Sequence, residues 1–445
     1  MAIQFDPQGQ IFYLHTKSTT YAIGVLREKY LLHLYYGKRI SAYPDFMAHL
    51  PIHAGTTWMG TDLPGLDYST EALPMEYPTY GSADLRTPAF HAEYETGSAV
   101  TCLAYCGYEI HHGKESLSGL PATYVESDSE ADTLEITLAD PLTGLKIVLS
   151  YSVFEDYDMI TKSVRAVNKG AESIDIRSIL SSTTYLFDKN YEFVHLTGAW
   201  ARERHIQKQP LMNGTMQIDS KRVASGHIHS PFLALARPWA TETQGEVYGY
   251  SFVYSGNFIM QAETNQQDVV RVNIGINPFG FHWLLEPGEA FQAPEVVMTF
   301  SDSGFGTMSR RFHRIYRQRL CRGKYRDIER PVLINNWEAT YFDFNEEKIL
   351  AIAEKARDVG IELMVLDDGW FGKRNSDNCS LGDWTPNPEK LPNGIDGLAE
   401  KVTQLGMRFG LWFEPEMVSE DSDLYRAHPD WCIHISGRNK TPARN

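Results

Sequence analysis

The sequence predicts two kinds of fold in one chain: a large antiparallel β-sandwich, followed by part of a (β/α)8 barrel. Up to about residue 306, apolar and polar side chains alternate with period two between turn signals, as in half-buried strands. Beyond residue 307, short apolar strands alternate with amphipathic helices, which indicates a parallel sheet with helical crossovers. Acidic and tryptophan residues follow these later strands, where barrel enzymes place ligand-contacting residues.

These patterns divide the chain into three parts. We expect the sandwich over residues 1–306, a connecting helix and linker over 307–330, and the first part of a catalytic barrel over 331–445. A (β/α)8 barrel needs ~250 residues, so we expect fewer than half of one here.

The sandwich prediction depends on a series of alternating segments. The clearest strand candidates are 134–138, 145–153, 174–176, 283–285 and 296–300. The turn signals Asn168-Lys169-Gly170 and Pro287-Gly288 flank two of them. The segment from Tyr68 to Phe90, rich in proline, tyrosine and glycine, is expected to be an ordered loop.

The barrel prediction depends on a second series. We expect a helix over 307–321, a strand over 332–336, and a helix that Asn345 caps and Gly360 ends. A buried strand over 363–366, a helix over 395–405 and a strand over 409–413 follow, with a fourth strand candidate at 431–435.

Composition excludes several classes of protein. The formal net charge of −16 disfavours nucleic acid and anionic membranes as partners. No apolar run is long enough to cross a membrane, and no signal peptide is visible at the start. The five cysteines are scattered, which suggests free thiols and a cytoplasmic location. No spacing of histidine, cysteine or acid predicts a metal site or a cofactor.

Asp367 and Asp368, which end the strand at 363–366 and precede Gly369-Trp370, are the most informative residues. Two carboxylates can accept hydrogen bonds from sugar hydroxyls, and a neighbouring indole can cover the apolar face of a sugar ring. A pair that caps the strand-to-helix turn and a magnesium site are the alternatives.

Other strand ends carry similar residues. Glu414 and Glu416 follow the strand at 409–413, and paired carboxylates are what glycoside hydrolysis requires. A buried network that braces the strand ends would explain them equally well. Trp337 and Trp412 end neighbouring strands, so both could wall one pocket.

Taken together, the motifs resemble the retaining α-galactosidases of glycoside hydrolase family 36. The runs that carry the resemblance are PMEYPTYGSADLRTPAF (74–90), NPFGFHWLLEPGEAFQAPE (277–295), VLINNWEATYFDFNEEK (332–348), LDDGWF (366–371), GDWTPNPEKLPNGI (382–395) and GLWFEPEMV (410–418).

The resemblance implies an N-terminal β-supersandwich and a catalytic barrel that acts on melibiose, raffinose and similar α-galactosides. It implies that Asp367 and Asp368 bind the galactose 4- and 6-hydroxyls. It also implies that Trp337 and Trp412 line the pocket, that Arg444 contacts the sugar, and that Glu414 and Glu416 only support the site. Trp58 would reach a neighbouring subunit's site in a homo-oligomer such as a tetramer.

The resemblance also implies a gap. Such enzymes carry the nucleophilic aspartate in a Lys-Trp-Asp motif and the acid/base aspartate further on, and no Lys-Trp-Asp occurs in these 445 residues. We therefore expect no catalytic residue here and no significant hydrolysis by these residues alone. Two alternatives remain: a non-catalytic galactoside-binding or scaffold protein, and a galactosyl transferase of the raffinose synthase type.

Overall fold

The chain folds into two compact units, Met1–Arg326 and Asp327–Asn445, in a computed structural model. The structure describes residues 2–41, 46, 72–82 and 84–440. The boundary between the units lies inside the segment 307–330 that the sequence predicts as the connection.

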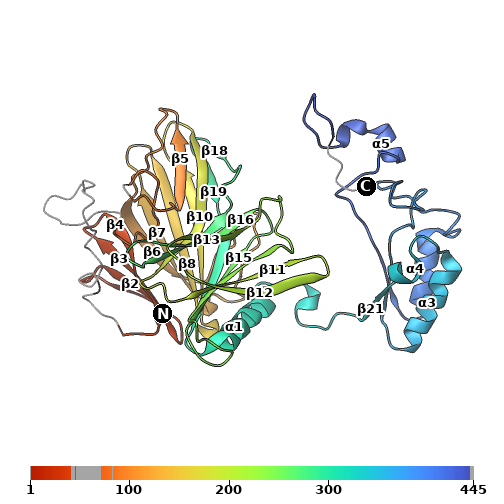
Figure 1. Ribbon diagram of the computed structural model, residues 1–445, viewed down its shortest axis with the longest axis horizontal. Helices are drawn as coiled ribbons and strands as arrows, with labels where there is room; N and C mark the ends of the chain where they lie inside the picture. The colour runs from red at the N-terminus through yellow and green to blue at the C-terminus, as the bar shows by residue number, and fades with distance from the viewer. Residues whose placement is uncertain (1, 42–45, 47–71, 83, 441–445) are drawn as a thin grey trace. The chain divides into compact units, whose positions relative to one another are not determined.

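Antiparallel sheets make up the first unit (Figure 1). In the described residues, a ten-stranded sheet has the order β12-β11-β14-β15-β20-β9-β8-β7-β6, with β19 paired to β9. Its strands are β6 (Ala104–His112), β7 (Asp132–Ala139), β8 (Leu145–Phe154), β9 (Met159–Asn168), β11 (Glu192–Ala199), β12 (Arg202–Pro210), β14 (His229–Ala236), β15 (Val247–Val253), β19 (Ala290–Gln292) and β20 (Glu295–Ser301).

Two smaller sheets accompany it in the described residues. A six-stranded sheet has the order β13-β16-β17-β10-β18, with β5 paired to β10, and a four-stranded sheet has the order β1-β2-β3-β4. Their strands are β1 (Ile3–Asp6), β2 (Ile11–His15), β3 (Thr19–Leu26), β4 (Tyr30–Lys38), β5 (Phe90–Tyr94), β10 (Ile174–Leu186), β13 (Gly214–Asp219), β16 (Phe258–Thr264), β17 (Val270–Ile276) and β18 (Trp283–Leu285). The described residues of this unit also form the 3-10 turns η2 (Asp128–Glu130), η3 (Glu155–Tyr157) and η4 (Lys324–Arg326).

The core between the sheets follows the alternation in the sequence. Leu134, Ile136 and Leu138 of β7 are buried in the main cluster, together with Leu149 and Tyr151 of β8. Each of the five strands expected from alternation is present, as β7, β8, β10, β18 and β20. The predicted antiparallel sandwich is therefore confirmed.

Helix α1 (Gly304–Arg319) packs on the outer face of the ten-stranded sheet. Met308, Phe312 and Ile315 are buried there at helical spacing, and each contributes about 1.5–3 kcal/mol. Gly249 of β15 permits the contact, because a Cβ there would lie 2.7 Å from Phe312 and 2.8 Å from Met308. The helix predicted over 307–321 is thus part of the first unit.

A buried ionic network lies inside the sandwich around Glu76. Its carboxylate accepts hydrogen bonds from Lys162 Nζ at 2.7 Å, from the Tyr21 hydroxyl at 2.7 Å and from the Tyr151 hydroxyl at 2.8 Å. Burial alone would raise the pKa of Glu76, but Lys162 and His33 lower it to about 2. The loop that carries Glu76 is therefore tied to the middle of β9.

A second buried ion pair holds the same loop further along. Asp84 accepts hydrogen bonds from Arg86 Nε at 2.9 Å and from the fully buried guanidinium of Arg271 in β17. Arg271 Nε also donates to the Tyr185 hydroxyl at 3.0 Å. The segment 74–90, one of the runs that resemble family 36, is thus anchored to both large sheets.

The second unit is built on a parallel sheet. In the described residues its order is β21-β22-β23, with β21 (Leu333–Asn335), β22 (Leu363–Leu366) and β23 (Arg408–Leu411). The helices are α2 (Trp337–Thr340), α3 (Glu346–Asp358), α4 (Gly394–Gln404) and α5 (Asp423–Ala427), and the 3-10 turn η5 spans Pro429–Trp431. Asn345 caps α3 as expected, since its side chain accepts a hydrogen bond from the Lys348 backbone N–H.

Helices α3 and α4 lie side by side and cover one face of this sheet (Figure 1). Met364 and Leu366 are buried against these helices, whereas Leu363 and Val365 on the other face are only half-buried. Strands joined by helical crossovers, with polar residues after each strand, are part of a (β/α)8 barrel, as the sequence predicts.

The strand predicted at 431–435 is wrong. Trp431 ends η5, the residues after it form no strand, and the side chains of Ile433 and Ile435 are 99% and 69% exposed. An apolar run forms a buried strand only where neighbouring strands and helices cover it, and nothing among the described residues covers this one.

Within the described residues, every helix is too short or too polar to span a bilayer.

Candidate active site

Three strand ends meet at the carboxyl edge of the parallel sheet. The register pairs Asn335 of β21 with Val365 of β22, and Val365 with Gly410 of β23. Asp367 lies two residues beyond Val365, and the Trp412 backbone N–H donates to the Leu366 carbonyl at 3.0 Å. The register therefore brings residues following all three strands to one edge.

Asp367 is held in place by its neighbours. Its Oδ1 accepts the Asp368 backbone N–H at 2.7 Å, and its Oδ2 accepts a hydrogen bond from the Asn335 side chain. Its own backbone N–H donates to Oδ1 of Asn336, a fully buried residue, at 2.8 Å. The half-buried carboxylate is thus fixed in orientation and keeps free lone pairs for a ligand.

Asp368 has a different environment from its neighbour. It is 5% exposed, and Arg374 donates to it through Nε (2.9 Å to Oδ1) and Nη2 (2.8 Å to Oδ2). Arg374 is 1% exposed and also donates to the carbonyls of Asp377 (2.7 Å) and Cys379 (2.9 Å). Asp368 therefore fixes the fold of the loop after β22.

Cations set the electrostatics around this loop. Burial alone would lower the pKa of Arg374, but the Asp368 carboxylate raises it. Burial lowers the pKa of Lys390, whose ammonium donates to the carbonyls of Phe342 (2.9 Å), Gly369 (2.9 Å) and Arg374 (3.1 Å). Two cations therefore hold the backbone beside Asp368.

A tryptophan follows each of the three strands of this sheet. Trp337 is half-buried, its backbone N–H donates to Asn335 Oδ1 at 2.7 Å, and its ring packs edge-on against Tyr341 and Phe342. The indole N–H of Trp370, which is 2% exposed, donates to the Trp412 carbonyl at 3.0 Å. Trp370 thus connects the loop after β22 to the end of β23.

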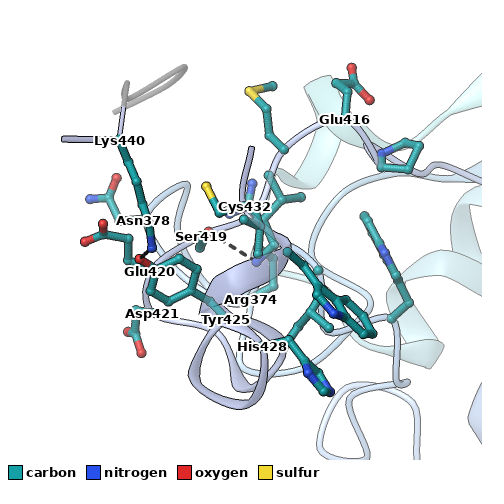
Figure 2. Close-up of a pocket in the computed structure, with 18 of the residues that line it drawn as sticks. Arg374, Asn378, Glu416, Ser419, Glu420, Asp421, Tyr425, His428, Cys432 and Lys440 are labelled. Atoms are coloured by element: carbon teal, nitrogen blue, oxygen red, sulfur yellow. Dashed lines mark hydrogen bonds between the residues drawn. The ribbon is translucent and has the colours of Figure 1, made fainter. Parts of the chain in front are cut away.

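Glu414 and Glu416 separate in space. Glu414 is 8% exposed, whereas Glu416 is exposed and lines a pocket of about 850 Å³. Figure 2 shows this pocket, in which Lys440 donates a hydrogen bond to the Tyr425 hydroxyl. Arg374 reaches its lining, but Asp367, Asp368, Trp337 and Trp412 do not.

Two predicted residues lie outside the described residues. Arg444 falls in 441–445 and Trp58 in 47–71, so their expected roles stay predictions.

Sequence reasoning missed Asn335, Asn336, Arg374 and Lys390. The Asn335-Asn336 pair carries a signal, because amides at the end of one strand can orient an acid that follows the neighbouring strand. Arg374 is detectable only by asking which cation compensates a buried acid.

Two family models match the chain. The model described as "Glycosyl hydrolase family 36 N-terminal domain" matches residues 29–286, and the model "Melibiase" matches residues 290–445. The chain belongs to glycosyl hydrolase family 36. The resemblance found in the sequence is therefore confirmed.

The family 36 relatives are α-galactosidases by name. Alpha-galactosidase AgaA of Geobacillus stearothermophilus is 50% identical over the whole chain, and Mel36A of Lactobacillus acidophilus is 41% identical. The chain spans 61% of AgaA and 60% of Mel36A. Among solved structures, AgaB of Geobacillus stearothermophilus matches with a TM-score of 0.95 at 50% identity, covering 100% of this chain and 61% of that one. An AgaA variant has been solved in complex with raffinose, matching at 50% identity with a TM-score of 0.94 and covering 98% of this chain and 60% of that one.

Proposed function

We propose that these residues form the galactose-recognising part of a retaining α-galactosidase that acts on raffinose- and melibiose-type oligosaccharides. The observation that carries the proposal is Asp367, oriented by Asn335 and Asn336 at the strand ends that also present Trp337 and Trp412. A fixed carboxylate beside indoles suits a hexose, whose hydroxyls donate and whose C–H face packs on aromatic rings. Family 36 relatives that are named α-galactosidases support the same conclusion.

The residues then take distinct roles. Asp367 accepts hydrogen bonds from the 4- and 6-hydroxyls of galactose. Asp368 is held by Arg374, which fixes the loop after β22, and one of its carboxylate oxygens contacts the same hydroxyls. Trp337 and Trp412 line the sugar pocket. Three roles come from the family resemblance: Arg444 contacts the sugar, Glu414 and Glu416 support the site, and Trp58 contacts a neighbouring subunit of a homo-oligomer in the cytoplasm.

The reaction proposed for the whole protein is a double displacement. A carboxylate attacks C1 and forms a covalent bond to galactose, while an acid protonates the oxygen of the leaving sugar. That acid, now deprotonated, then acts as a base and activates water, which releases galactose with retained configuration. The 445 residues contain no Lys-Trp-Asp motif for the nucleophile. We therefore assign binding and orientation, and no bond-breaking step, to this chain.

Calorimetry with galactose and with glucose, its 4-epimer, tests the proposal. We expect the 445-residue chain to bind galactose more tightly than glucose and to leave an aryl α-galactoside uncleaved. Asp367→Ala is expected to weaken galactose binding at least tenfold, because it removes the acceptor for the 4-hydroxyl.

The matched control is Asp358→Ala, which removes an exposed carboxylate at the end of α3 and is expected to leave galactose affinity unchanged. Equal affinity of wild type and Asp367→Ala for galactose would overturn the assignment of the site. Aryl α-galactoside turnover near that of a full-length relative would overturn the division of roles.

A further inference from the structure

A polar groove lies on the outer face of the ten-stranded sheet, far along the chain from Asp367. Five hydroxyl residues from three adjacent strands line it, and we call it the hydroxyl groove: Thr133 of β7, Ser150 and Ser152 of β8, and Thr161 and Ser163 of β9. The register places Thr133, Ser152 and Thr161 in one cross-strand row. Its volume of about 520 Å³ lies in the range of small-molecule sites.

The composition of this sheet face changes at a defined place. Met159 of β9 and Phe154 of β8 are buried in the apolar cluster that α1 covers. Further along the same face of the two strands come Thr161 and Ser163, and Ser152 and Ser150. Where a helix covers the face it is apolar, and beside the helix it is lined with hydroxyls, so the hydroxyl groove suits a polar occupant.

A loop that forms one wall of the groove is fixed at both ends. The Thr133 hydroxyl lies 2.7 Å from the Gly113 carbonyl oxygen and 2.8 Å from the Ser152 hydroxyl. Lys114 is ion-paired with the buried Glu295 at 2.7 Å and also donates to the Thr123 carbonyl at 2.9 Å. The loop between them is therefore held in one arrangement, which gives a preformed cleft.

One buried polar atom of the groove has no hydrogen-bond partner among the described residues, Nε2 of His111. Thr161, Ser163 and the exposed Arg165 line the same groove and add further donors and acceptors. Because buried polar groups normally find partners, the open position at His111 favours a polar molecule bound in the groove.

The charged side chains and aromatic rings of the hydroxyl groove indicate which class of ligand it could bind. Arg165 and Glu135 both line the groove, and Glu135 accepts a hydrogen bond from Ser150 at 2.8 Å, so the groove offers donors and acceptors without a strong excess of either charge. Trp283 is 46% exposed at the edge and packs on Phe291, with ring centroids 5.0 Å apart. A half-exposed indole beside mixed polar groups matches a neutral sugar, which has hydroxyls around its edge and an apolar C–H face.

We propose that the hydroxyl groove is a second saccharide-binding site, separate from the galactose site, in which one neutral sugar unit packs on Trp283 and hydrogen-bonds to Ser163 and Arg165. It binds saccharide without cleaving it. The assignment is independent of the function proposed for the second unit.

The test uses the 445-residue chain with Asp367→Ala, which is expected to weaken the galactose site, and raffinose as the probe. Calorimetry is expected to show residual raffinose binding, and hydrogen exchange is expected to show slower exchange at Gly113–Thr123 when raffinose is present. Adding Trp283→Ala or Arg165→Ala is expected to weaken this binding at least tenfold. Trp283→Phe is expected to restore most of it, because the ring is kept.

Trp200→Ala is the matched control, since Trp200 is 85% exposed and does not line the groove. The proposal is overturned if Asp367→Ala binds no raffinose while it remains folded by circular dichroism, or if binding survives Trp283→Ala and Arg165→Ala unchanged. Failure of the galactose site appears separately, as equal galactose affinity with and without Asp367→Ala.

Discussion

Asp368 and Arg374 form a two-point ion pair that is almost completely removed from water, with Nε 2.9 Å from Oδ1 and Nη2 2.8 Å from Oδ2. Its neighbour Asp367 is held instead by the neutral amide of Asn335 and by a backbone N–H. The two adjacent acids thus differ: Arg374 donates to both oxygens of Asp368, which fixes the loop after β22, whereas Asp367 keeps more of its lone pairs for a ligand.

Arg374→Met is expected to destabilise the second unit by about 3–5 kcal/mol, because it leaves the Asp368 carboxylate buried and unpaired. Urea unfolding followed by tryptophan emission measures this. Arg426→Met, which removes a cation paired with the exposed Asp421 and Asp423, should cause little change. Equal effects of the two substitutions would contradict the structural role of Arg374.

Asn335→Ala is expected to weaken galactose binding by about tenfold, since it releases one oxygen of Asp367 from its fixed orientation. Calorimetry with galactose is the measurement. The control is Asn345→Ala, which removes the N-cap of α3 and costs about 1 kcal/mol of stability but should leave the affinity unchanged. If Asn335→Ala also keeps wild-type affinity, Asn335 has no positioning role.

Lys162→Met is expected to destabilise the sandwich by about 3–5 kcal/mol, because Glu76 then stays buried without its cation. The double variant Glu76→Gln/Lys162→Met should lose clearly less than the sum of the two single variants, since no charge is left unpaired. Hydrogen exchange of the β8 and β9 amides measures the loss of unfolding free energy in each single variant and in the double variant. Strict additivity would contradict the coupling.

Acid should weaken the sandwich through Glu76. Its pKa is about 2 in the folded protein and near 4.5 when unfolded, so the unfolded state binds the proton first as pH falls. The stabilisation is complete above about pH 4.5 and is lost between there and pH 2. Hydrogen exchange of β9 at several pH values should show a shallower pH dependence in Glu76→Gln, whereas Glu93→Gln, an exposed control, should follow the wild type.

Gly304→Ala is expected to destabilise the first unit by more than Gly323→Ala does. Both glycines have φ near +78° (+78° and +79°), so an alanine meets the same backbone strain of about 1–2 kcal/mol at either position. Only at Gly304 does the added Cβ collide, at 2.2 Å from the Thr241 carbonyl oxygen. Thermal unfolding compares the two, and equal losses would show that the collision is relieved by movement.

Much of the fold could be predicted from local patterns. Alternation located β7 and β8 because one face of each is core, and Asn345 marked the start of α3 because its side chain caps a helix. The strand predicted at 431–435 failed because apolar residues such as Ile433 mark a buried strand only when other elements cover them. That condition is not visible in a short window of sequence.

The candidate site was predictable in part. Asp367 and Trp412 follow strands, so the parallel register alone brings them to one edge. The different environments of Asp367 and Asp368 were not predictable, because the partner Arg374 comes from a loop whose path no periodic pattern describes. Glu414 and Glu416 are two residues apart, a spacing that would place both side chains on one face of a strand, but the chain leaves β23 at Leu411 and turns at residues 415–416, so only Glu414 is buried.

The burial of Trp370 also makes its intrinsic fluorescence a probe of folding. Its indole is 2% exposed, whereas Trp200, Trp239 and Trp283 of the first unit are 85%, 58% and 46% exposed. Because an indole shielded from water emits at shorter wavelength, the blue edge of the fluorescence spectrum should report unfolding around Trp370 in the second unit, without any label.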